Sequence, residues 1–258
     1  MKTRYFIFLS FDGSSYHGWQ DQPDSETVQK TLEHALSLAL SEEIKTTGAG
    51  RTDSGVHAEY FCAHFDSVAD DLDTREKFNF RINKILPKDI SVSNLTKVRP
   101  DAHARFSAIS RTYRYDITRS KDPFSTDVAW YIYGPLDVEK MNEACHILYQ
   151  HTDFTSFSKL HTDVKTNNCR IYHAQWEQSG DRLSFTIKAD RFLRNMVRAI
   201  VGTMIQLGQG KISVVDFESV ILARNRCRAG QSAPAKGLFL INIEYPQEIF
   251  ILSSNNKK

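Results

Sequence analysis

The 258-residue sequence is poor in cysteine, and neither its cysteines nor its histidines are spaced as in a metal site. Its four cysteines are far apart and form no Cys-x-x-Cys pair, which argues against a zinc site. Its nine histidines show no His-x-x-x-His helix signature, so we expect no metal. In a chain of this size we expect the four thiols to be buried and reduced; they are those of Cys62, Cys145, Cys169 and Cys227.

Long apolar runs and strong charge are also missing. No run approaches the length of a membrane span, and no signal peptide with an apolar core stands at the start, so we expect a soluble cytoplasmic protein with no membrane partner. The net charge is only +2, which gives little support for nucleic-acid binding unless basic residues cluster locally. Hydrophobic residues make up 41%, enough for a packed core.

The first hundred residues alternate between strand-like and helical patterns. Residues 4–11 are rich in strand formers, and apolar residues then recur at helical spacing from Val28 to Leu40, with Asp24 or Ser25 as the N-cap. The remaining elements are a short strand near 44–48, a strand over 59–66, a helix over 73–86 and a strand from Ile90. This βαββαβ order is that of a ferredoxin-like split βαβ unit.

The second half repeats the mixture. We expect strands around 113–117 and 129–133, a helix over 137–149, a hairpin of 170–177 with 183–189, helices over 192–207 and 214–223, and a closing strand over 238–245. The fold class is therefore α+β, with two ferredoxin-like halves, antiparallel or mixed sheets and a central cleft. The expected domains are 1–102 and 103–250, followed by a polar tail over 251–258.

One glycine-rich segment stands out between two expected strands: residues 48–57 read GAGRTDSGVH. Glycine permits positive φ and close approach of another backbone, so this loop can present one side chain, Asp53, rigidly. Taken alone, the loop fits an ordinary turn, whose aspartate caps a neighbouring backbone group, at least as well. The segment has neither a Gly-Lys-Ser/Thr sequence nor a dinucleotide glycine pattern, so it does not read as a phosphate-binding loop.

Six other blocks carry a family resemblance together with this segment. They are FDGSSYHGWQ at 11–20, HARFSA at 103–108, RTYRY at 111–115, DFTSF at 153–157, NMVRAIVG at 195–202 and GLFL at 237–240. In this order they resemble the tRNA pseudouridine synthase A family over nearly the full length. One departure is visible after His57, where the family commonly has a Gly-Gln pair and this chain has Ala58-Glu59.

The resemblance implies a pseudouridine synthase fold and an isomerase that converts uridine to pseudouridine at positions 38, 39 and 40 of the tRNA anticodon stem-loop. It implies no cofactor, and a homodimer with one tRNA spanning both subunits. Asp53 would be the catalytic carboxylate, Arg198 the cation paired with it, and Tyr113 the ring beside the target base. Read alone, Arg198 fits a solvated helix residue and Tyr113 a core strand tyrosine.

RNA contacts are expected from clustered basic residues. Arg51, two residues before Asp53, is suited to fill the space left by a flipped base or to hold the adjacent phosphate. The other candidates are Arg111, Arg114, Arg119 and Lys121; Arg191 and Arg194; and Arg224, Arg226 and Arg228. Each cluster fits a solvated face equally well.

Two other classes of function compete with an RNA isomerase. A noncatalytic RNA-binding module would tolerate the loss of Asp53, Tyr113 and Arg198, yet all three are present. A glycoside or nucleoside hydrolase commonly uses two carboxylates, and the nearest partner, Glu59, has no spacing argument behind it. The sequence leaves open whether Asp53 attacks C1′ or C6 as a nucleophile or removes a sugar proton as a base.

Overall fold

The computed structural model describes residues 2–159 and 166–251 and divides the chain into two compact units. Unit 1 comprises Met1–Ile109 together with the C-terminal segment from Leu240. Unit 2 comprises Ser110–Phe239. Apart from Ile251, the tail expected at 251–258 lies outside the described residues.

The division differs from the expected domains because two segments of the expected second half pack on unit 1. Residues 103–109 join it through Ala104, whose backbone N–H donates to His64 Nδ1 at 3.1 Å. The C-terminal segment joins it through Tyr245, whose hydroxyl donates to the carbonyl oxygen of Ala104 at 2.6 Å. Such tertiary contacts leave no periodic pattern in the sequence.

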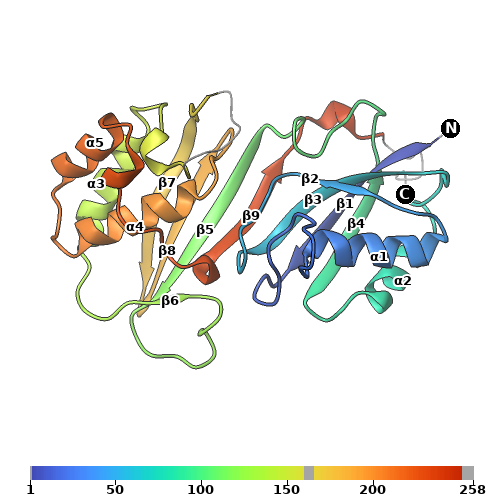
Figure 1. Cartoon of the computed structure of the whole chain (residues 1–258), viewed down its shortest axis with the longest axis horizontal. Coiled ribbons are helices and arrows are strands. Elements are labelled where there is room, and N and C mark those ends of the chain that lie inside the picture. The colour runs from blue at the N-terminus through green and yellow to red at the C-terminus, as the bar shows by residue number, and fades with distance from the viewer. Residues whose placement is uncertain (1, 160–165, 252–258) are drawn as a thin grey trace. The chain divides into compact units, whose positions relative to one another are not determined.

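Unit 1 contains the strand and helix order expected from the sequence. Its sheet has the strand order β4-β1-β3-β2, with every neighbouring pair antiparallel. The elements are β1 (Thr3–Phe11), α1 (Val28–Leu40), β2 (Thr46–Gly48), β3 (His57–Ser67), α2 (Phe78–Ile85), β4 (Ile90–Lys97) and the 3-10 helix η4 (Gln247–Ile249) (Figure 1).

Helix α1 forms where its apolar residues recur at helical spacing, and this face is buried. Its N-cap is Thr27, whose side chain accepts a hydrogen bond from the backbone N–H of Lys30 at 3.4 Å. The expected caps, Asp24 and Ser25, lie outside the helix. The helix ends at Leu40 and is followed by its C-cap Ser41, which has a left-handed conformation with φ 52°.

Helix α2 is shorter than the expected helix over 73–86. Its N-cap is Lys77, whose φ of 60° lies in the left-handed region and interrupts a helical path from residue 73. The residues before it form turns instead, with Arg75 bonded to Asp71 through both its backbone N–H and its side chain. Helix α2 ends before Pro87, as the sequence indicates.

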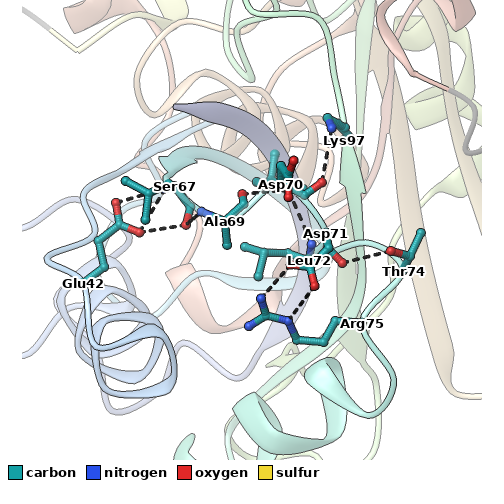
Figure 2. A network of polar contacts seen from close by, with 11 residues as sticks. Glu42, Ser67, Ala69, Asp70, Asp71, Leu72, Thr74, Arg75 and Lys97 are labelled. Carbon is teal, nitrogen blue, oxygen red and sulfur yellow. Dashed lines mark hydrogen bonds and ion pairs between the residues drawn. The ribbon is translucent and has the colours of Figure 1, made fainter. Parts of the chain in front are cut away.

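The segment that follows β3 is fixed by a network of polar contacts (Figure 2). Ser67 Oγ donates to Glu42 at 2.7 Å, Lys97 Nζ donates to the carbonyl oxygen of Asp70 at 3.2 Å, and Arg75 pairs with Asp71 at 2.6 Å. The chain here contains four aspartates between 66 and 73. Two of these carboxylates are paired with arginines, Asp66 with Arg4 at 2.8 Å and Asp71 with Arg75 at 2.6 Å.

Strand β1 forms the core of unit 1 and is buried on both faces from Tyr5 to Leu9. Phe6 meets Tyr245 and Phe250 edge-on, with ring centroids 5.1 and 6.1 Å apart. The C-terminal segment therefore covers part of the sheet, which explains why β1 reads as a continuous apolar run rather than an alternating one.

Unit 2 has the strand order β5-β8-β7, antiparallel throughout, and the short strand β6 runs parallel to β5. The chain is thus an α+β protein with a mixed sheet. The elements are β5 (Ser110–Thr118), β6 (Trp130–Tyr131), α3 (Val138–Leu148), η1 (Thr155–Phe157), β7 (Ile171–Ser179), β8 (Arg182–Ala189), α4 (Met196–Gly208), α5 (Val214–Leu222), η2 (Arg226–Arg228), η3 (Ala235–Gly237) and β9 (Leu238–Glu244), which crosses the boundary between the units.

Helices α3, α4 and α5 gather beside β7 (Figure 1). The side-chain amide of Asn142 in α3 forms two hydrogen bonds with the backbone of Trp176 in β7. It donates to the carbonyl oxygen at 3.1 Å and accepts from the N–H at 2.8 Å. Asp137 is the N-cap of α3 and Ser213 is the N-cap of α5, where Ser213 forms a full capping box with Asp216.

Three expectations for the second half and the cysteines need correction. The strand expected over 129–133 has only two residues. Helix α4 begins at Met196 rather than 192, because Asn195 has a left-handed conformation with φ 67°. Cys227 is exposed, whereas Cys62, Cys145 and Cys169 are buried. Within the described residues, no helix is long and apolar enough to cross a membrane.

A buried histidine in unit 1 makes stability depend on pH. Burial and the nearby Arg4 lower the pKa of His64 to about 4, while the unfolded chain has an ordinary histidine pKa of about 6.5. The unfolded state thus binds the proton more readily, so stability is complete above about pH 6.5 and falls as the pH drops toward 4. Between pH 7.5 and pH 5 this one group contributes about 2 kcal/mol to the loss.

We expect His64→Asn to reduce this loss, because the amide oxygen can accept the Ala104 bond and does not titrate. Urea unfolding of both proteins at pH 7.5 and pH 5 measures the difference. The wild-type protein should lose more stability than the variant over this interval. Equal losses in the two proteins would show that His64 is not the group responsible.

Candidate active site

The loop between β2 and β3 carries Asp53 and is fastened to the loop that follows β1. Trp19 donates its backbone N–H to Thr52 Oγ1 at 2.9 Å. The carbonyl oxygen of Tyr16 accepts from the backbone N–H of Gly55 at 3.3 Å and from Ser54 Oγ at 3.2 Å. Two motifs far apart in the sequence, 11–20 and 48–57, therefore form one rigid substructure around Asp53.

Glycines make this close approach possible. A Cβ on Gly18 would lie 2.3 Å from the carbonyl oxygen of Thr52, and Gly18 also has a φ of 88°. A Cβ on Gly13 would lie 2.0 Å from the carbonyl oxygen of Val56. Within the motif itself, Gly55 has a φ of 76°, whereas Gly50 has open space around it. Only some of the motif's glycines are therefore required by the backbone.

His57 begins β3 and anchors the other end of the Asp53 loop. Its buried Nδ1 accepts from the backbone N–H of Gly13 at 3.1 Å, and Asp12 Oδ1 lies 3.1 Å from the same nitrogen. Partial burial raises the pKa of Asp12, but hydrogen bonds from Ser14 and the nearby His57 outweigh it, so this pKa lies below its usual value. Asp12 and His57 stand in the family blocks at 11–20 and 48–57, and no role was predicted for either from the sequence.

Asp53 is half-buried at the start of a turn. Its backbone carbonyl oxygen closes the turn by accepting from the N–H of Val56 at 3.2 Å. Partial burial weakens solvation of the carboxylate, which strengthens its interaction with any cation or reacting atom nearby. A carboxylate held in this way can act as a nucleophile or as a general base.

Arg198 lies in the first turn of α4, and its side chain is half-buried rather than fully solvated. Its Nε donates to the carbonyl oxygen of Ala233 at 2.7 Å, and the backbone N–H of Ala233 donates to the carbonyl oxygen of Arg198 at 2.9 Å. Together these two hydrogen bonds between Arg198 and Ala233 fix the direction of the guanidinium. The segment around Gln231 can cross α4 closely because residue 202 is a glycine. A Cβ on Gly202 would lie 1.8 Å from the carbonyl oxygen of Gln231.

Tyr113 lies on β5 and is half-buried. Its ring meets Phe192 edge-on, with centroids 5.1 Å apart. The fully buried tyrosine of this strand is Tyr115, whose hydroxyl donates to the carbonyl oxygen of Pro234 at 2.8 Å. The strand pattern allows Tyr113 to be a core residue, but the core tyrosine of this strand is Tyr115.

The expected RNA-contact residues have different surroundings. Arg111 donates to the carbonyl oxygen of Asp190 at 3.1 Å, and Arg114 Nε donates to Asp116 at 2.9 Å. Arg191 is half-buried, whereas Arg194 and Arg51 are exposed. Arg51 and Asp53 belong to unit 1, whereas Tyr113, Arg198 and the other arginines predicted to contact RNA belong to unit 2.

Comparison with known proteins decides the family. The family model for tRNA pseudouridine synthase matches residues 7–107 and 144–246 of this chain. The chain belongs to the tRNA pseudouridine synthase family. It is therefore an enzyme of the isomerase class. This assignment excludes the two alternative functions, a noncatalytic RNA-binding module and a hydrolase.

Relatives of this tRNA pseudouridine synthase are similar over nearly their whole length. The tRNA pseudouridine synthase A of Bacteroides fragilis is 55% identical over 96% of this chain and 98% of its own. That of Bacteroides thetaiotaomicron is 54% identical over 99% and 94%. That of Bacillus licheniformis is 42% identical over 92% and 97%.

Proposed function

We propose that this enzyme converts uridine to pseudouridine at positions 38, 39 and 40 of the tRNA anticodon stem-loop, with Asp53 as its catalytic carboxylate. The observation that carries the proposal is the Asp53 loop, which the 11–20 segment holds at Thr52, Ser54 and Gly55. The N1–C1′ bond breaks, the base rotates and a C5–C1′ bond forms, while C5 loses a proton and N1 gains one. No group enters or leaves, so the reaction needs no cofactor.

Tyr113 and Arg198 are proposed to act on the same uridine as Asp53. A guanidinium beside Asp53 would favour its ionised form, which either catalytic route requires. The Ala233 carbonyl oxygen that accepts from Arg198 Nε supports this role, because it sets the direction of the planar fork. Tyr113 would stack on the base, an interaction that contributes about 1–3 kcal/mol.

The proposed fold is a pair of ferredoxin-like halves, 1–102 and 103–250. The strand order β4-β1-β3-β2 in unit 1 supports the first half, because both βαβ connections are split by an intervening strand. The order β5-β8-β7 supports the second, with β8 separating β5 from β7 in the same way. A cytoplasmic homodimer binding one tRNA across both subunits completes the proposal.

Arg111, Arg114, Arg191 and Arg194 are the proposed phosphate contacts of unit 2. Arg194 is the strongest of them because it is exposed at the entrance to α4. Arg114 is the weakest, since its guanidinium already pairs with Asp116 and lies 4.9 Å from the centre of the Phe239 ring. Each such contact should add to the salt dependence of tRNA binding.

Arg51→Ala should slow the reaction mainly on paired uridines. A uridine in a stem must leave the helix to reach Asp53, at a price of a few kcal/mol, and an exposed arginine can fill the space it vacates. We expect kcat/KM to fall about 10- to 100-fold on a stem with a paired target uridine. On the same stem with the target mismatched, the loss should be several-fold smaller; equal losses on both RNAs would contradict the role.

The position assignment can be tested with transcripts of one tRNA that keep a single uridine at position 38, 39 or 40. Chemical sequencing after incubation with the enzyme should find pseudouridine at each of these positions. A transcript with none of the three should remain unmodified. Modification confined to uridines elsewhere in the tRNA would overturn the assignment.

A further inference from the structure

Ser232 lies at the centre of a small polar network in unit 2. Its Oγ accepts from Asn195 Nδ2 at 2.6 Å and from Arg226 Nη2 at 2.9 Å. Asn195 is the N-cap of α4, and its left-handed conformation sets the direction in which the helix leaves. The network therefore joins the start of α4 to the segment that follows η2.

Arg226 turns its guanidinium back onto its own segment. Its Nη1 donates to the carbonyl oxygen of Gly230 at 3.1 Å, while its Nη2 holds Ser232. Its neighbour Arg224 pairs with Asp153 at 3.0 Å, and Arg228 is exposed. The arginine cluster at 224–228 is thus divided, and Arg226 stabilises a loop rather than facing solvent as an RNA contact would.

The segment 230–233 then lies directly on α4. The backbone N–H of Gly230 donates to Thr203 Oγ1 at 2.9 Å, and Gln231 crosses at Gly202. The next residue after Ser232 is Ala233, whose carbonyl oxygen accepts from Arg198 Nε. Any shift of Ser232 is therefore transmitted within one residue to the acceptor that orients Arg198.

We propose that Ser232 is a positioning residue for Arg198: its hydroxyl, held between Asn195 and Arg226, fixes the backbone whose Ala233 carbonyl directs the guanidinium. This rests on the proposed role of Arg198 in the reaction. Ser232 itself touches no reacting atom in this scheme. Its loss should lower the rate of the chemical step and leave tRNA affinity unchanged.

Single-turnover rates and tRNA dissociation constants of the full-length enzyme test this. Ser232→Ala should reduce the rate about 10-fold with a dissociation constant within about 2-fold of wild type, because small misplacements of catalytic groups lower rates strongly. Ser232→Thr keeps the hydroxyl and should restore most of the rate. Ser219→Ala, which removes a hydroxyl that donates to the carbonyl oxygen of Val215 in the same helix, should match wild type.

A double-mutant cycle separates positioning from general destabilisation. In an Arg198→Ala background, Ser232→Ala should have no further effect on the rate, because the group that it positions is already gone. Equal fold-losses in both backgrounds, or weakened tRNA binding without a rate effect, would overturn the inference. A wild-type enzyme that forms no pseudouridine in the same assay would instead overturn the proposed function.

Discussion

Asp53→Asn is expected to lower the single-turnover rate of pseudouridine formation by at least about 1,000-fold while tRNA affinity stays within about 3-fold of wild type. The amide has nearly the shape of the carboxylate, so the loop contacts at Thr52, Ser54 and Gly55 should persist. It is neutral, however, and can neither attack a carbon nor accept a proton in either proposed route.

Rapid-mixing rates and filter binding on the same tRNA preparation provide the measurement. Asp101→Asn is the matched control, because it makes the same chemical change in unit 1 at an exposed carboxylate paired with Arg99. We expect this control to keep the wild-type rate within about 2-fold. An Asp53→Asn enzyme that retains a tenth of the activity would exclude Asp53 as the catalytic carboxylate.

Gly18→Ala is expected to lower turnover about 100-fold, because it acts directly on the loop that carries Asp53. The new Cβ would lie 2.3 Å from the Thr52 carbonyl oxygen, one residue before Asp53. The positive φ of 88° adds strain that alanine cannot relieve, about 1–2 kcal/mol. The loop must therefore move, and stability should fall as well.

Gly210→Ala separates the two effects. Gly210 also has a positive φ, 70°, yet its Cβ would meet open space. We expect this variant to lose about 1–2 kcal/mol of stability and to keep full activity. Urea unfolding and turnover measured on both variants test the argument. If Gly18→Ala lost no more activity than Gly210→Ala, contact between the two loops would not position Asp53.

Much of the fold follows from local patterns in the sequence. The strand and helix order and the hairpin of 170–177 with 183–189 were predicted because each depends on neighbouring residues. The missed boundaries have another cause. Lys77 and Asn195 adopt left-handed conformations, which set where α2 and α4 begin. Such conformations are uncommon for any residue other than glycine, although asparagine adopts them more often than lysine.

The candidate site is less accessible to sequence reasoning. Asp53 was found through family resemblance. The sequence of its loop does not reveal that Gly18 and Trp19 contact this loop at Thr52. Arg226 was grouped with its neighbours as an RNA contact because composition cannot reveal that its side chain returns to Ser232. Such contacts join residues distant in sequence or reverse a side chain's direction, and neither leaves a periodic signal.

The role of Asp53 in pseudouridine formation is tested most directly by mapping the product. Unmodified tRNA is incubated in parallel with wild-type enzyme and with Asp53→Ala, and pseudouridine is then located by chemical sequencing. We expect modification within the anticodon stem-loop from the wild-type enzyme and none from the variant. Product from both proteins, or from neither, would contradict the account.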